Sequence, residues 1–185
     1  MENPDKPSKI DTCYFDIETT NLTANYGIML CAVIKPQHGK PRVFRLDELR
    51  NGIRSEDKKL VNAVIEELGK YQFLVSYNGI RFDTKFINTR AMYHRLDPLG
   101  ERLHIDLLNV ARRILRTNNR RLDTVVNFLE VEEKKTAIDP KYWRWAMLGD
   151  SKAMDEVVKH CVQDVLALEC VHERLAPYIK NVRRQ

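Results

Sequence analysis

The order of strand-like and helix-like segments is the feature that most restricts what this chain can fold into. Three strand patterns come first, at residues 13–18, 28–34 and 42–46. The first alternates apolar and polar side chains, whereas the second is almost continuously apolar, as in a strand that is buried on both faces. Residues 36–41, with two prolines and a glycine, form a turn between the second and the third. The pattern predicts an antiparallel meander of three strands.

After the meander, strands and helices alternate. Apolar strand patterns at residues 73–76 and 103–105 are each followed by a helical pattern. The expected helices cover residues 55–69, 83–95, 107–115, 122–129, 139–148 and 151–176, the first with Ser55 and the last with Ser151 as its N-cap. We therefore predict an α/β fold with a mixed five-stranded sheet flanked by helices. In that sheet a three-strand antiparallel meander is followed by strand–helix units.

The length of 185 residues suits one domain. We expect a flexible N-terminal tail at residues 1–9, a single domain at 10–180 and a basic C-terminal tail at 181–185. With 43% hydrophobic and 31% charged residues, the chain is typical neither of disordered nor of membrane proteins. No segment resembles a signal peptide or a membrane span, and the four cysteines lack a CxxC spacing. These features predict a soluble, cytoplasmic or otherwise intracellular protein with free thiols, no targeting signal and no membrane partner.

Basic residues exceed acidic ones, 31 against 26, and five arginines fall within residues 112–121, where no acid occurs. Such a cluster can neutralise the phosphates of a nucleic acid. It can equally be a solvated helix end whose cations complement the helix dipole.

Two carboxylates, Asp16 and Glu18, lie two positions apart on the first strand and therefore point to the same face. Negative charges on an otherwise apolar segment are costly unless they are paired, and carboxylate oxygens are the ligands that Mg²⁺ and Mn²⁺ prefer. The pair alone also suits an edge strand whose outer face meets water. Further acidic residues favour the metal interpretation.

Asp83 follows the turn that succeeds a buried strand and begins a helix. Sheets with parallel strands form sites at such junctions, although helix capping also explains an aspartate there. Asp164 lies in the last helix with His160 one turn earlier on the same face; an ordinary surface pair is the alternative. Asp106 is interpreted as a helix-capping residue or as a residue that supports the site residues from outside the site. The remaining histidines are interpreted as structural or exposed: His38, His94, His104 and His172.

Three short motifs occur in a characteristic order: FDIET at residues 15–19, YNGIRFD at 77–83 and HCVQD at 160–164. In order and spacing they resemble the three motifs of the DEDD superfamily of 3′–5′ exonucleases, whose fold is ribonuclease H-like. The chain is most similar to the proofreading exonuclease domain of family B DNA polymerases and to the stand-alone predicted ribonuclease H-like relatives of that domain. The resemblance extends from about residue 13 to residue 176, nearly the whole chain.

The resemblance implies a function and a set of site residues. The enzyme would be a two-metal-dependent 3′–5′ exonuclease of single-stranded nucleic acid, with DNA favoured and RNA possible, that releases nucleoside monophosphates. Two divalent cations, Mg²⁺ or Mn²⁺, would be held by Asp16, Glu18, Asp83 and Asp164. His160 would orient the attacking water or accept its proton. Contacts to the strand are expected from Thr19, Asn78, Phe82, Arg120 and Arg121, although Phe82 also suits the core.

One position departs from the family pattern. Relatives carry either a tyrosine four residues before the last aspartate or a histidine five residues before it, whereas this chain has His160 at the four-residue spacing. It thus combines the geometry of one branch with the side chain of the other, which leaves the identity of the proton acceptor open.

Two other functions remain open from the sequence. Ribonuclease H-like sites also cut internally, so the chain could be a structure-specific endonuclease. A catalytically inactive nucleic-acid-binding module is the second alternative, and the intact carboxylates argue against it.

Overall fold

One mixed sheet of six strands forms the centre of the described part of the computed structural model, which covers residues 11–49, 56–133, 138–179 and 183–184. The order across the sheet is β3–β2–β1–β4–β5–β6. The strands are β1 (Thr12–Thr19), β2 (Met29–Pro36), β3 (Arg42–Arg45), β4 (Phe73–Ser76), β5 (Leu103–Asp106) and β6 (Arg183–Arg184). The expectations for residues 1–9, for the Ser55 cap and for most of 181–185 lie outside the described residues.

The pairing of the strands confirms the predicted topology. β1 pairs antiparallel with β2 and β2 with β3, whereas β4 is parallel to both β1 and β5. The two-residue β6 adds a sixth strand to the predicted five and pairs antiparallel with β5 at the edge of the sheet. β6 falls in the segment that was predicted as a basic C-terminal tail. The boundaries of the tails and of the domain stay predictions.

The helices are α1 (Leu46–Leu49), α2 (Lys58–Leu68), α3 (Asp83–His94), α4 (Leu107–Ile114), α5 (Leu122–Phe128), α6 (Lys141–Met147) and α7 (Ser151–Leu175), followed by the short η1 (Ala176–Tyr178). α7 begins at Ser151 as predicted, but its N-cap is Asp150, whose side chain accepts a hydrogen bond from the backbone N–H of Ala153 at 3.0 Å. Among the described residues, no helix is both long and apolar enough to cross a membrane.

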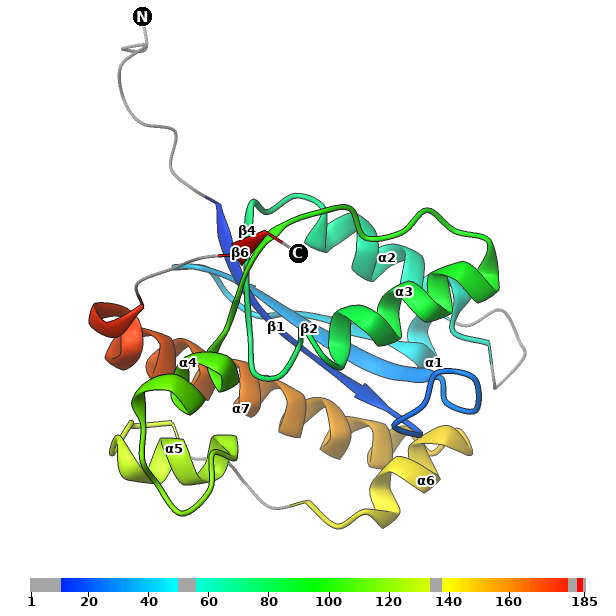
Figure 1. Cartoon of the computed structure of the whole chain (residues 1–185). Helices are drawn as coiled ribbons and strands as arrows, with labels where there is room; N and C mark the ends of the chain where they lie inside the picture. The colour runs from blue at the N-terminus through cyan, green and yellow to red at the C-terminus, as the bar shows by residue number, and fades with distance from the viewer. Residues whose placement is uncertain (1–10, 50–55, 134–137, 180–182, 185) are drawn as a thin grey trace, which may run out of the picture.

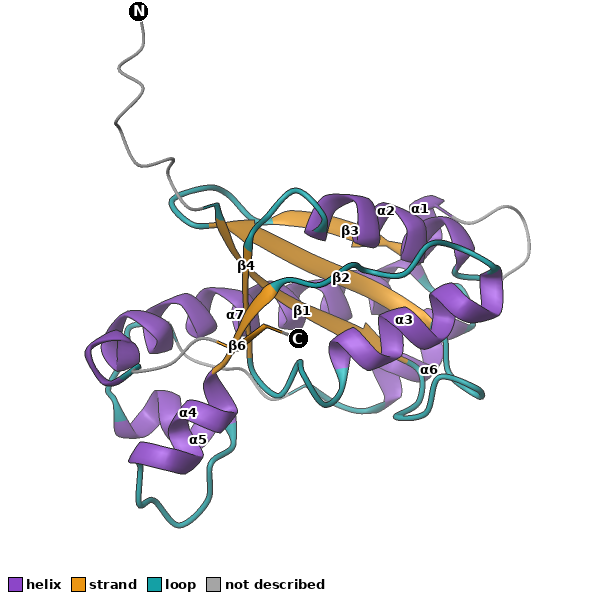
Figure 2. Ribbon diagram, turned by 45° about the horizontal axis from the view of Figure 1, so that its top comes forward, coloured by secondary structure: helices purple, strands orange, loops and turns teal. Residues whose placement is uncertain are grey.

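Helices cover both faces of the sheet, with α2 and α3 on one side and α7 running across the other (Figures 1 and 2). Successive side chains of β1 point alternately to the two faces of the sheet and therefore face different helices. Tyr14 points to α7, where its hydroxyl is hydrogen-bonded to His172 Nδ1 at 3.0 Å. Phe15 points to the opposite face, where its ring lies 5.6 Å from that of His104. Asp16 and Glu18 share the face of Tyr14 and therefore look toward α7.

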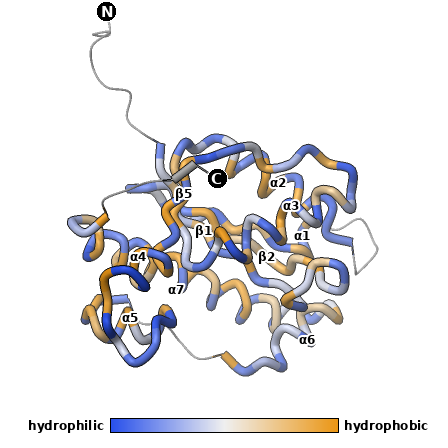
Figure 3. Tube along the Cα trace, in the orientation of Figure 1, coloured by the Kyte–Doolittle hydropathy of each residue, from blue (hydrophilic) through white to orange (hydrophobic). Residues whose placement is uncertain are grey.

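The core explains the apolar run of the second strand. All residues of β2 except the last are buried, because both of its faces are covered. Hydrophobic stretches of the chain gather in the sheet and along α7, and hydrophilic ones in the outer loops (Figure 3). All four cysteines are free, as predicted, and three of them are buried.

Candidate active site

Side chains from β1 and α7 meet near the C-terminal end of β1. Atoms of Asp16, Glu18 and Cys161 that could bind a metal lie within 4.8 Å of one another. The Cys161 sulfur is 3.5 Å from both the backbone carbonyl and the Oδ2 atom of Asp16. Burial raises the pKa of the Cys161 thiol well above its ordinary value, and the neighbouring carboxylates add to the effect. The thiol is therefore protonated at neutral pH and donates to Asp16. In this form Cys161 is not a metal ligand, because only a thiolate binds metal.

Asp83 approaches the same strand from α3. Its side chain is only 3% exposed, and its Oδ1 atom accepts a hydrogen bond from the backbone N–H of Ile17 at 3.2 Å. Burial raises the pKa of Asp83 well above its ordinary value, and the negative charges of Asp16 and Glu18 raise it further. The three carboxylates therefore repel one another, and little water is available around Asp83 to weaken the repulsion.

The turn between β4 and α3 brings Asp83 into position. Asp106, at the end of β5, accepts hydrogen bonds from the backbone N–H groups of Asn78 at 2.9 Å and Ile80 at 3.2 Å. It also caps α4. Asp106 is thus a capping residue, as predicted, and in addition it holds the turn that carries the second motif.

Two adjacent residues meet the backbone requirements of this turn. Asn78 has a φ of 70°, in the left-handed region that asparagine tolerates better than most residues. At Gly79 the chain passes so close to Ser76 that a Cβ would lie 2.6 Å from the Ser76 Cβ. A larger side chain at Gly79 would displace the turn.

His160 and Asp164 lie on α7, and both are buried, with 8% and 7% exposure. This burial contradicts the alternative of a surface pair. The Nε2 atom of His160 lies 3.8 Å from Glu18 Oε1 and 3.9 Å from Asp164 Oδ2. The imidazole thus stands between one carboxylate of β1 and one of α7, beyond hydrogen-bond length from each.

Trp143 is a site neighbour that the sequence did not indicate. Its indole Nε1 donates a hydrogen bond to Glu18 Oε2 at 2.8 Å, and its ring lies edge-on to that of His160. The helix that carries it was predicted, but no spacing or motif distinguishes this tryptophan from Trp145. Cys161 was likewise predicted only as a buried thiol.

A cavity of about 710 Å³ opens beside the carboxylates. Its lining joins the acidic residues to the turn after β4 and to the arginine-rich segment between α4 and α5. Lining residues include Asp16, Asn78, Arg112, Arg120, Arg121 and Asp164. The hydroxyl of Tyr77 donates to the backbone carbonyl of Arg120 at 2.7 Å and so connects two walls of the cavity.

Two of the predicted substrate contacts lie outside this lining. The Thr19 hydroxyl donates to the carbonyl of Asn21 at 2.9 Å, at the end of β1. Phe82 is partly buried, and its ring centroid lies 5.8 Å from that of Phe86. The structure therefore brings together all five predicted catalytic residues and, in the neighbouring cavity, three of the five predicted strand contacts.

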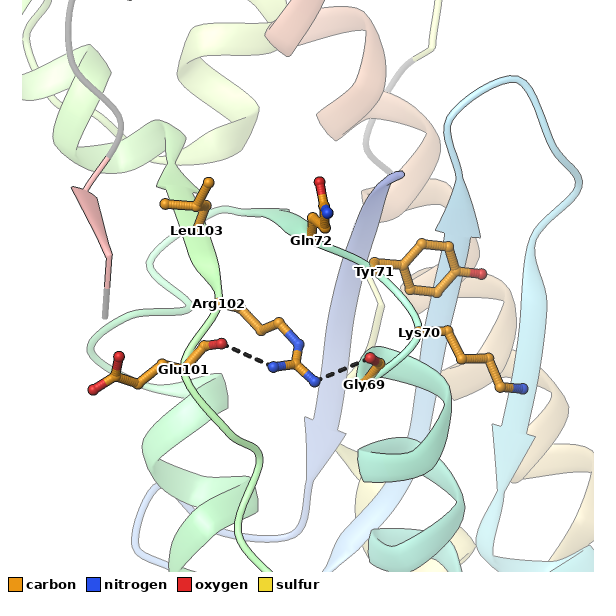
Figure 4. A pocket seen from close by; sticks show the side chains of 7 residues that line it. All are labelled: Gly69, Lys70, Tyr71, Gln72, Glu101, Arg102 and Leu103. Carbon is orange, nitrogen blue, oxygen red and sulfur yellow. Dashed lines mark hydrogen bonds between the residues drawn. The ribbon is translucent and has the colours of Figure 1, made fainter. Parts of the chain in front are cut away.

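A second cavity, of about 600 Å³, lies at the other end of the parallel strands. Figure 4 shows its lining, in which Arg102 donates hydrogen bonds to the carbonyls of Glu101 and Gly69, at 2.8 and 3.0 Å. It lies at the N-terminal ends of β4 and β5, and none of the predicted site residues lines it. Sites in sheets with parallel strands form at the carboxyl ends of the strands, which favours the first cavity.

The topology and the acidic cluster on the central strand define a ribonuclease H-like domain. The RNase_H_2 family model, described as RNase_H superfamily, matches residues 13–176, and the chain therefore belongs to this superfamily. The resemblance that the three motifs predict is confirmed.

Relatives include two DNA polymerases. A DNA polymerase of Methanocaldococcus jannaschii is 30% identical over an alignment of 101 residues, which covers 43% of this chain and 6% of that protein. A PolC-type DNA polymerase III of Ureaplasma parvum serovar 3 is 31% identical over an alignment of 138 residues, which covers 64% of this chain and 10% of that protein. This chain thus matches a small part of the length of each relative.

A solved structure shares the fold. The family B DNA polymerase of the hyperthermophilic archaeon Pyrobaculum calidifontis superposes with a TM-score of 0.71 at 20% identity. The superposition covers 95% of this chain and 26% of that one. At this level of identity, the comparison shows that the two proteins share a fold.

Proposed function

We propose that this protein is a divalent-cation-dependent 3′–5′ exonuclease that hydrolyses single-stranded nucleic acid and releases nucleoside monophosphates. The observation that carries the proposal is the convergence of acidic side chains from three distant motifs beside a cavity lined by arginines. The relatives are DNA polymerases, which favours DNA over RNA as the substrate.

The donor set fits Mg²⁺ or Mn²⁺. Asp16, Glu18, Asp83 and Asp164 offer hard oxygen donors and would hold two such cations. Burial raises the pKa of Asp83 most, and the negative charges of Asp16 and Glu18 raise it further; bound cations would offset that repulsion. When bound, the cations activate water and stabilise the negative charge that develops on the phosphate and on the leaving 3′ oxygen.

Other residues of the chain would perform the remaining tasks. His160, between Glu18 and Asp164, would orient the attacking water and accept its proton. The Cys161 thiol and the backbone N–H of Ile17 would keep Asp16 and Asp83 oriented through their hydrogen bonds.

The nucleic-acid strand would pass through the cavity beside the carboxylates. Arg120 and Arg121 would bind its phosphates, and Asn78 would line its path. Thr19 and Phe82, at the ends of the elements that carry the first two motifs, would border that path outside the cavity.

A digestion panel tests the proposal. Labelled single-stranded DNA, double-stranded DNA and RNA are incubated with the protein in Mg²⁺ or Mn²⁺, with EDTA as the metal-free arm. We expect single-stranded DNA to shorten stepwise from its 3′ end, with no cleavage in EDTA. Asp16→Ala should lose nearly all hydrolysis and keep its fold, because removing one of several like charges relieves repulsion. Asp97→Ala, an exposed aspartate after α3, is the matched control.

A closed circular single strand separates the alternatives. An exonuclease leaves the circle intact, whereas a structure-specific endonuclease opens it. Binding without cleavage of any substrate would identify an inactive nucleic-acid-binding module. Full activity of Asp16→Ala in Mg²⁺ would overturn the proposed site.

A further inference from the structure

α6 brings one aromatic side chain against two residues of the acidic site. The Trp143 indole N–H donates to Glu18 Oε2 at 2.8 Å. The same ring meets the His160 imidazole edge-on, with centroids 5.8 Å apart and planes at 80°. We propose that Trp143 is a positioning residue, which orients the Glu18 carboxylate for a divalent cation and holds the His160 ring beside it. This inference rests on the proposed function.

The chemistry of the donor suits this task. An indole N–H is a donor only, carries no charge and does not titrate, so it leaves the negative charge of Glu18 available to a cation. A lysine or arginine in its place would compete with the cation for that charge. A carboxylate offers about four lone-pair positions, so one bond to Oε2 restricts its rotation without occupying all the positions that a cation could use.

The other carboxylates of β1 and α3 follow the same pattern. Asp83 accepts from the backbone N–H of Ile17, and Asp16 is contacted by the thiol of Cys161. Glu18 has one more rotatable bond than an aspartate and so loses more conformational entropy when it is ordered. A rigid, partly buried ring is an effective way to hold such a side chain, and groups of this kind orient metal-binding carboxylates in general.

The placement of α6 gives Trp143 its role and also supplies a control. Ala146, three residues later on the same face, is 4% exposed, and α6 packs against α7. Trp145 lies on another face of α6, where it is 44% exposed and meets the ring of Tyr142 edge-on at 5.8 Å. Trp143 and Trp145 are the two tryptophans of the chain. Substituting one of them at a time therefore leaves a single indole, either the inner or the outer one, to be observed.

The test combines a spectroscopic and a binding measurement. Trp145→Phe leaves Trp143 as the single indole, and its Nε1–H resonance is followed by NMR while Mg²⁺ alone is added. We expect this resonance to move with Mg²⁺ concentration, and the Trp145 resonance of Trp143→Phe to stay in place. By calorimetry, Trp143→Phe should bind Mg²⁺ about 10- to 100-fold more weakly than wild type. Its kcat should recover as Mg²⁺ is raised, which a purely structural defect would not do.

The outcomes distinguish the inference from the function on which it rests. If wild type binds Mg²⁺ and cuts nucleic acid, and Trp143→Phe matches it within about threefold in both, well short of the expected loss, the positioning role is wrong and the proposed function stands. If wild type binds Mg²⁺ and the Trp143 resonance moves, but nothing is cut, the positioning of Glu18 stands and the proposed function fails. If wild type binds no Mg²⁺, both fail. The resonance titration uses Trp145→Phe, so it does not depend on the folding of Trp143→Phe.

Discussion

The Oδ1 atom of Asp83 accepts a hydrogen bond from the backbone N–H of Ile17, at 3.2 Å. Ile17 lies between Asp16 and Glu18, so this contact brings the start of α3 to the acidic end of β1. It adds a third carboxylate to two that already share a face. The hydrogen bond favours the ionised form of Asp83, but burial and the neighbouring charges outweigh it, and its pKa is raised.

Asp83→Asn should stabilise the metal-free protein at neutral pH. The folded pKa of Asp83 is raised above its ordinary value of 3.8, so the folded state holds the proton longer than the unfolded state does. The free energy of unfolding therefore falls as pH rises from 3.8 through the folded pKa. Asparagine keeps the acceptor oxygen for Ile17 and removes the charge.

Thermal unfolding in EDTA at several pH values checks this prediction. The Tm of Asp83→Asn should exceed that of wild type at pH 7, and the difference should vanish below about pH 4, where Asp83 is protonated in both states. Mg²⁺ should raise the Tm of wild type more than that of the variant. A lower Tm of the variant at pH 7 would show that the combined effect of burial and of the neighbouring charges on Asp83 does not dominate at this position.

The buried acid Asp57 should matter more for stability than a partly exposed acid. Asp57 is fully buried, accepts from the backbone N–H of Met29 at 2.8 Å, and lies 2.7 Å from Arg90 Nη2 and 2.6 Å from His94 Nε2. Asp57→Ala leaves the Arg90 charge buried without its partner, which costs about 3–5 kcal/mol. Urea unfolding measures this loss.

Asp47 is the matched control, since it pairs with Arg45 in a more exposed position. Asp47→Ala should cost clearly less than Asp57→Ala, because water still reaches the Arg45–Asp47 pair. Changing Arg90 to leucine together with Asp57→Ala should recover part of the loss, because no unpaired charge remains. Equal costs for Asp47→Ala and Asp57→Ala would mean that burial does not control the strength of these pairs.

His104 should make the protein less stable as pH falls. Burial lowers the pKa of His104 from 6.5 to about 4. Between these values the unfolded state binds a proton that the folded state does not, so the free energy of unfolding decreases as pH drops from 6.5 toward 4. At about 1.36 kcal/mol per pH unit, this amounts to about 3 kcal/mol.

Chemical denaturation between pH 4 and 7 measures the effect. His104→Gln, which keeps a polar partner for Ser76, should flatten the slope, whereas His38→Gln at an exposed turn should leave it unchanged. Some slope should remain, because burial also lowers the pKa of His172. Identical slopes in His104→Gln and wild type would contradict the prediction.

Arg120 and Arg121 should contribute to substrate binding by neutralising phosphates. Both line the cavity beside Asp16. Replacing both with alanine should raise KM for longer strands. It should also flatten the salt dependence by about 0.7 for each phosphate of a single strand that the variant no longer neutralises. Arg113→Ala is the control: this arginine belongs to the same cluster, but it is directed to the carbonyl of Tyr178 and lies outside the cavity lining. If both changes leave the salt slope alike, the cluster is a solvated helix end.

The fold could be predicted from the sequence because each of the five predicted strands carries its own local signal; the two-residue β6 carries none. The alternation of β1 and the apolar run of β2 indicate, from the sequence alone, which faces of these strands are buried. The candidate site was predicted in another way, from the order and spacing of three motifs that resemble those of a nuclease superfamily. Local geometry contributes only within a motif. Asp16 and Glu18 are two positions apart on a strand, and His160 and Asp164 four apart on a helix, so local geometry alone aligns each pair.

The contacts that hold these groups could not be predicted, because they join distant parts of the chain. Trp143 meets Glu18 across 125 positions, and Cys161 meets Asp16 across 145. Only the packing of α6 on α7 decides which of two nearby tryptophans faces inward. The N-cap of α7 was misassigned for a smaller reason: Asp150 and Ser151 are adjacent and both are good caps, so the side chain that bonds Ala153 decides.

The last prediction concerns His160, where this chain departs from the pattern of its family. Its Nε2 atom lies 3.8 Å from Glu18 and 3.9 Å from Asp164, so the ring reaches the space between the two carboxylates. If the imidazole accepts a proton from the attacking water, His160→Ala should lower kcat by about 10²- to 10⁴-fold with little change in substrate binding.

His160→Tyr should keep appreciable activity, because the four-residue spacing before Asp164 is the one that tyrosine has in relatives. A phenol titrates near 10 and an imidazole near 6.5 in water, so the acidic limb of the pH profile of kcat should disappear in this variant. His160→Ala activity within about threefold of wild type from pH 6 to 9, far above the general-base range, would leave His160 with packing against Trp143 as its only role.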